Sequence, residues 1–135
     1  MIQVIAGVFL VVHGLVHLLY FGQSARRFEL QPGMLWPDGS WAFSKLLGVN
    51  GTRTLASIFC ILAAAGFMIA GAGILFGQPW WRMVVVASAV LSVVLYILFW
   101  NGKLKQLANQ GGVGILIDVA VLAAVLIFKW PQFDF

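Results

Sequence analysis

Two histidines stand four residues apart in an otherwise apolar segment, VVHGLVHLLYF, which runs from Val11 to Phe21. They are His13 and His17, and the chain has no others. A spacing of four places both side chains on one face of a helix. The apolar segment VGILIDVAVL near the C-terminus contains one carboxylate, Asp118. Imidazole and carboxylate groups together can exchange protons, hydrogen-bond a polar ligand or bind a metal ion.

The composition indicates an integral membrane protein. Of the 135 residues, 62% are hydrophobic and 9% are charged, whereas a soluble domain has about 25% charged residues. The net charge of +4 is small, so we do not expect nucleic-acid binding. A single cysteine, Cys60, excludes an internal disulfide and a CxxC redox pair.

Four segments are long and apolar enough to cross a bilayer, which takes roughly 20 residues. We therefore expect one four-span membrane domain covering residues 1–135, of the all-α class. The first segment has no Lys or Arg before its apolar run, so we expect a retained span rather than a cleaved signal peptide. Backbone groups must be hydrogen-bonded inside lipid, which predicts a four-helix bundle. The expected spans are 2–21, 55–76, 81–100 and 113–128.

The basic residues predict the orientation. Cytoplasmic loops of membrane proteins are enriched in Lys and Arg. The loops after the first and third expected spans contain Arg26, Arg27, Lys45, Arg53, Lys103 and Lys105, whereas the other side has Arg82 and Lys129. We therefore expect both termini outside the cytoplasm.

The long first loop, residues 23–52, is predicted to be structured. Pro32-Gly33 and Pro37-Asp38-Gly39 are turn signals. Ser40 can cap a short helix that ends before Gly48. The aromatic residues in this loop predict a cytoplasmic cap that either lies at the interface as an anchor or folds over the end of the bundle as a lid.

Polar side chains from several spans are expected at one depth. An unpaired charge in lipid costs at least about 2.5–3.5 kcal/mol, so we predict a hydrogen bond or ion pair between Asp118 and His17 or His13. Ser92 and Tyr96 lie on one helical face and should reach the same layer. The predicted ligand or proton site is therefore His13, His17, Asp118, Tyr96 and Ser92.

Several interpretations of this site stay open. A metal site of His13, His17 and Asp118 would suit zinc or non-haem iron. Haem is disfavoured, because bis-histidine ligation needs histidines on two facing helices. A purely structural His–Asp clamp is the alternative to a functional site. Cys60 and the small residues Gly66 and Ala70 are interpreted as packing residues.

The segment HGLVHLLYFG, the WW at residues 80–81 and LSVVLYILFWNGK at residues 91–103 resemble an uncharacterised family of small four-span bacterial membrane proteins with an HGLxHLLxF first span. Some members are labelled transporter permeases. The first span also resembles, more distantly, that of DoxX-type four-helix proteins. The resemblance implies a four-span bundle in the bacterial inner membrane and assigns no reaction.

These observations favour a non-enzymatic function: an accessory subunit of a larger membrane complex, or a small-ligand-binding protein with an intramembrane His/Asp site. The alternatives are a metal-dependent or proton-transferring membrane enzyme and an oligomeric small-solute transporter. The lipid bilayer is the expected partner, together with a larger complex or further copies of the chain. The sequence names neither a cofactor nor a ligand.

Overall fold

The computed structural model describes residues 1–135, and it is all-helical with no strands. The predicted all-α fold with four membrane-spanning helices is confirmed. The helices are α1 (Ile2–Ser24), α2 (Ser44–Leu75), α3 (Trp81–Phe99) and α4 (Val113–Leu122); a 3₁₀ turn η1 (Leu104–Gln106) and the wider π turns η2 (Ala108–Gly112) and η3 (Ala123–Ile127) complete the last segment.

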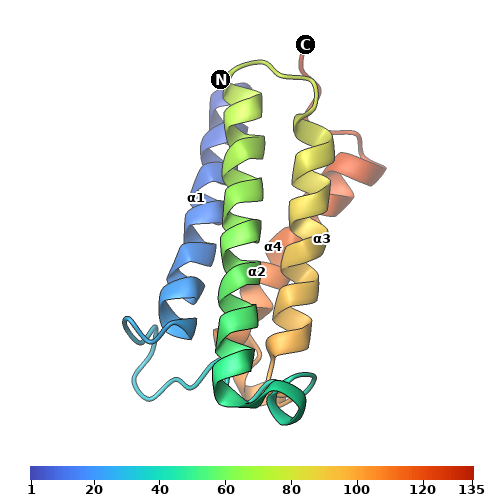
Figure 1. Cartoon of the computed structure of the whole chain (residues 1–135). Helices are drawn as coiled ribbons and strands as arrows, with labels where there is room; N and C mark the ends of the chain where they lie inside the picture. The colour runs from blue at the N-terminus through green and yellow to red at the C-terminus, as the bar shows by residue number, and fades with distance from the viewer.

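The four helices form an antiparallel bundle in which both chain termini lie at the same end (Figure 1). Helix α1 packs along α2, α2 packs along α3, and α3 packs along α4. The connection from residue 25 to residue 43 and the turns η1 and η2 lie at the opposite end (Figure 1). Each span is long and apolar enough to cross a membrane, so the chain is an integral membrane protein.

Glycines bring α1 and α2 into close contact. A Cβ atom on Gly71 would lie 2.6 Å from the carbonyl oxygen of Gly7, and one on Gly14 would lie 2.9 Å from the carbonyl oxygen of Ala64. Small residues allow helix backbones to approach in this way inside a membrane. The predicted packing role of Gly66 fits a second contact, because it faces the Ser88 side chain of α3.

The helix boundaries differ from the predicted spans. Helix α1 continues to Ser24, and α2 begins at Ser44 rather than near residue 55. Hydropathy marks only the part of a helix that lies in lipid, and a helix can extend beyond it with polar residues. The expected break at Gly48 is present, because this residue interrupts α2 with a φ of 68°. The last span is a ten-residue α-helix between two π turns.

The first connection folds over the end of the bundle. The Ser40 hydroxyl donates to the carbonyl oxygen of Leu98 at 2.6 Å, and the Trp41 indole donates to that of Ile97 at 2.6 Å. These bonds satisfy carbonyls in the last turn of α3 that have no partner within the helix. Trp36 is 1% exposed and belongs to the hydrophobic cluster beneath the connection. The connection therefore packs on the end of the bundle, and its predicted place at the membrane interface stays a prediction.

An ion-pair network holds this connection. Asp38 accepts two hydrogen bonds from Arg53, both 2.7 Å long, and lies 2.8 Å from Arg26. Partial burial opposes ionisation of this carboxyl, but the hydrogen bonds from Arg53 and Arg26 outweigh it and hold the pKa of Asp38 below its ordinary value. The network therefore ties the connection to the ends of α1 and α2.

Trp81, the first residue of α3, is buried at the end of the bundle that holds the termini. It is 3% exposed and forms part of the core. The C-terminal segment covers it: Phe133 packs on the Trp81 ring, and the neighbouring Arg82 donates to the carbonyl oxygen of Pro131 at 2.7 Å. A segment that returns over the bundle has no local signal in the sequence.

Replacing Gly71 by leucine should separate α1 from α2. The new side chain would meet the Gly7 backbone and Val11, and overpacking of this kind costs about 1–3 kcal/mol. We expect a lower unfolding midpoint in detergent, measured by intrinsic fluorescence. Ala65→Leu, on the exposed face of the same helix, is the matched control. Equal midpoints for the two variants would contradict the glycine-mediated packing.

Replacing Asp38 by asparagine should destabilise the protein at neutral pH by about 1.5–3 kcal/mol, the range for hydrogen bonds to charged groups. The folded-state pKa lies below the ordinary 3.8, so this contribution is present above about pH 4 and is lost as the pH falls through the folded pKa. The stability difference between wild type and variant should therefore shrink below pH 4. Asp134→Asn, at an exposed carboxylate, should show no such difference. A stability difference between wild type and Asp38→Asn that does not change with pH would argue against the ion pairs.

Candidate functional site

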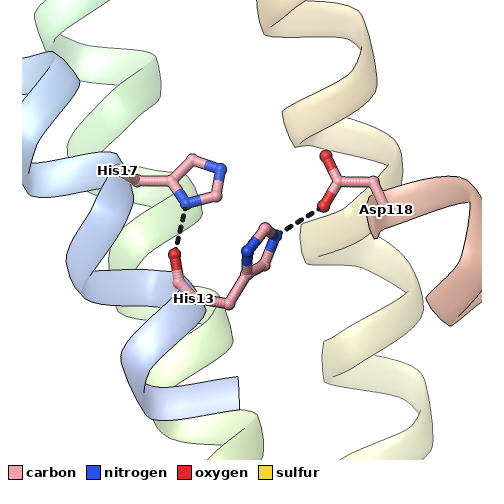
Figure 2. Close-up of side chains that lie close together, drawn as sticks. All are labelled: His13, His17 and Asp118. Atoms are coloured by element: carbon pink, nitrogen blue, oxygen red, sulfur yellow. Dashed lines mark hydrogen bonds and ion pairs between the residues drawn. The ribbon is translucent and has the colours of Figure 1, made fainter. Parts of the chain in front are cut away.

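His13, His17 and Asp118 come together in the interior of the bundle, between α1 and α4 (Figure 2). Their exposed fractions are 5%, 0% and 0%. One donor atom from each residue lies within 4.8 Å of the other two. The sequence analysis predicts that these three residues share one site, and the structure brings them into one cluster.

The predicted histidine–aspartate contact is confirmed. His13 Nε2 lies 2.8 Å from Asp118 Oδ1. The carboxylate oxygen accepts, so Nε2 of His13 carries the hydrogen. These residues are 105 positions apart in the chain, and their bond joins the first helix to the last. Of the two histidines considered from the sequence, His13 is the partner of Asp118.

His17 is oriented by its own helix. Its Nδ1 lies 2.9 Å from the carbonyl oxygen of His13, one turn earlier. A carbonyl only accepts, so Nδ1 carries the hydrogen and Nε2 of the neutral ring holds a lone pair. The Ser92 hydroxyl, 2.7 Å away, donates to that nitrogen. The predicted site residue Ser92 thus reaches the cluster, on the His17 side.

Aromatic rings enclose both imidazoles. The Phe67 ring lies 4.6 Å from the ring of His13 and 5.2 Å from that of His17, between centroids. The Tyr96 ring lies 5.6 Å from that of His17 and is 1% exposed. Tyr96 therefore contributes a wall of the site, as a member of the predicted set. Phe67 was not predicted, because a phenylalanine in an apolar span has no distinguishing pattern.

Gly111 positions the carboxylate. This residue has a φ of 102°, in the left-handed region that favours glycine, and a Cβ atom there would overlap the Tyr96 ring. The chain can therefore lie against Tyr96 as it enters α4. In the sequence, the signal for this contact is the Gly111-Gly112 pair directly before the last span.

One atom of the cluster lacks a partner. Asp118 Oδ2 is fully buried and makes no hydrogen bond. A buried unsatisfied polar atom costs about 1–3 kcal/mol, and more when the group is charged. The carboxylate thus has unused acceptor capacity inside the site.

Cys60, which the sequence analysis interprets as a packing residue, is buried in a hydrophobic cluster with Tyr96 and Trp36. The Ser88 hydroxyl donates to the carbonyl oxygen of Val84 in its own helix at 2.7 Å. Neither belongs to the histidine–aspartate cluster.

An apolar cavity of about 220 Å³ lies between the histidine–aspartate cluster and the end of the bundle that holds the two chain termini. Phe9 lines this cavity and also stacks on the His13 ring, with centroids 6.1 Å apart. Val121, one turn after Asp118, lines it from α4. Phe9 therefore borders both the cavity and the polar cluster.

Comparison of the chain with protein-family models gave no match, and neither did comparison with curated proteins or with solved structures. The resemblance to the small four-span bacterial family therefore stays a prediction. The chain is defined by its fold and site: a four-span membrane protein with a buried cluster of two histidines and one aspartate.

Proposed function

We propose that this protein binds a small ligand inside the bilayer through His13, His17 and Asp118. The observation that supports this most directly is the buried, unpartnered Oδ2 atom of Asp118. A bound ligand would supply the missing interaction and would offset the cost of burying this oxygen without a partner.

The electrostatics favour binding over a purely structural role. Joining α1 to α4 needs one acceptor for the His13 N–H group, and a neutral amide would provide it at a lower desolvation cost than a carboxylate. An ionisable side chain inside a membrane is expensive and is by default a functional candidate. Asp118 adds a second oxygen and a titratable charge that the His13 contact does not use.

The accessory-subunit, enzyme and transporter interpretations stay predictions. Large apolar side chains are exposed along the outer faces of the helices, such as Leu116 and Ile127 on the last span. They fit contact with lipid, and also with a larger complex or with further copies of the chain.

Asp118→Asn tests binding against the structural clamp. Asparagine keeps an acceptor for His13 but removes the charge, so the fold should persist while ligand is lost. Protein extracted gently from its own membranes should keep a bound species in native mass spectrometry, and the variant should not. A ligand at 100 times its Kd adds about 2.7 kcal/mol of stability, so the wild type should also unfold later than the variant.

Asp134→Asn is the control for this experiment, since its side chain is exposed near the C-terminus. It should retain both the bound species and the unfolding midpoint. If neither the wild type nor Asp118→Asn has a bound species, and both unfold at the same midpoint, only the structural clamp would remain.

We also propose that both termini lie outside the cytoplasm of a bacterial inner membrane. The proposal is supported by the charge count, because the end of the bundle opposite the termini holds most of the basic residues. An alkaline phosphatase fused after Phe135 should be active, whereas a green fluorescent protein fused at the same position should not fluoresce. Inserted at Leu104, which is 79% exposed, the same reporters should give the reverse. The opposite pattern at both places would show an inverted topology.

A further inference from the structure

We infer that the ligand of this site is a divalent transition-metal ion of the zinc class, bound by His13, His17 and Asp118. This inference rests on the proposed binding function and names the chemistry of its ligand. It is carried by the convergence of three buried donor groups (Figure 2) together with the unpartnered oxygen of Asp118.

The donor set suits such an ion. Two imidazoles and one carboxylate bind zinc and other first-row transition metals, and they leave coordination positions open. Alkaline-earth ions prefer six or more oxygen ligands, which this apolar interior does not offer. A haem would require histidines on facing helices, whereas both are on α1.

The distances are close to those of a bound state. Metal–nitrogen bonds of about 2.0–2.1 Å place tetrahedral ligands roughly 3.3 Å apart. The donor atoms here already lie within 4.8 Å of one another. The distance between two donor atoms would have to shorten by at most about 1.5 Å. Rotation of the side chains can provide this movement without a change in the helices.

The surrounding bonds resemble the support that metal-binding histidines need. A ligating histidine usually donates its other ring N–H to a carbonyl or carboxylate, which fixes its tautomer. His17 Nδ1 already donates to the His13 carbonyl oxygen at 2.9 Å, which leaves the Nε2 lone pair free for a metal in place of the Ser92 hydroxyl.

The metal ion would take the place of the hydrogen that His13 Nε2 carries in the metal-free protein. In the metal-free protein, His13 Nε2 donates this hydrogen to Asp118 Oδ1 at 2.8 Å. A metal on Nε2 requires the other neutral tautomer of His13, so this hydrogen would move from Nε2 to Nδ1 of the same ring as the ion enters. The freed Nε2 and the two carboxylate oxygens would then face the same cation as His17.

The test uses the full chain, produced in medium supplemented with Zn²⁺ or Co²⁺, so that the ion is present while the bundle assembles. After extraction in mild detergent, elemental analysis should give about one metal per chain. The Co²⁺ form should show the strong visible absorption of a four- or five-coordinate site. Native mass spectrometry of the same samples detects any other bound species.

Two variants remove one ligand each, Asp118→Asn and His17→Gln, and Asp134→Asn is the matched control. Both ligand variants should bind metal more than tenfold more weakly and lose the Co²⁺ spectrum, whereas the control should match wild type. If His17→Gln fails to fold, Asp118→Asn still decides the outcome, because it keeps the acceptor for His13.

The outcomes separate the two proposals. Metal in wild type that Asp118→Asn retains undiminished would overturn the metal site. A non-metal species bound to wild type and absent from Asp118→Asn would overturn the metal inference and leave the binding function standing. No metal and no other species on wild type would overturn both.

Discussion

The contact between His13 and Asp118 joins the two helices that the rest of the chain does not place side by side. Helices α1, α2, α3 and α4 each pack along the next in sequence, and the hydrogen bond of 2.8 Å links the first to the last. Inside a membrane such a bond cannot be exchanged for one to water. The packing elsewhere must therefore deliver both side chains to the same depth.

Two glycine contacts at opposite sides of the site achieve this. Gly7 and Gly71 let α1 lie directly on α2, which fixes the depth of the histidine turn. Gly111 lets the start of α4 lie on the Tyr96 ring, which fixes the depth of Asp118. The site is thus positioned by backbone approach on both of its sides, and the His17 ring is held by its own helix and by Ser92 of α3.

The sequence was sufficient for the elements that periodicity and hydropathy determine. The four spans and the joint face of His13 and His17 follow from spacing alone, and the cost of a charge in lipid predicted a partner for Asp118. Which histidine it contacts depends on helix depth to within one turn, which hydropathy does not resolve. The roles of Phe67 and Trp81 depend on tertiary packing: one encloses the imidazoles, and the other is covered by a returning C-terminal segment.

The charge of Asp118 is the feature that a structural role explains least. A clamp between α1 and α4 requires only that His13 find an acceptor, and burying a carboxylate for that purpose costs several kcal/mol more than burying an amide. The extra cost is offset when the second oxygen also has a positively charged or hydrogen-donating partner. In this bundle the two imidazoles lie beside the carboxylate, and the Nε2 lone pair of His17 accepts only a hydrogen bond from the neutral Ser92 hydroxyl. A lone pair beside a carboxylate attracts a cation, and the enclosed aromatic walls of Phe67 and Tyr96 would keep water from competing for it.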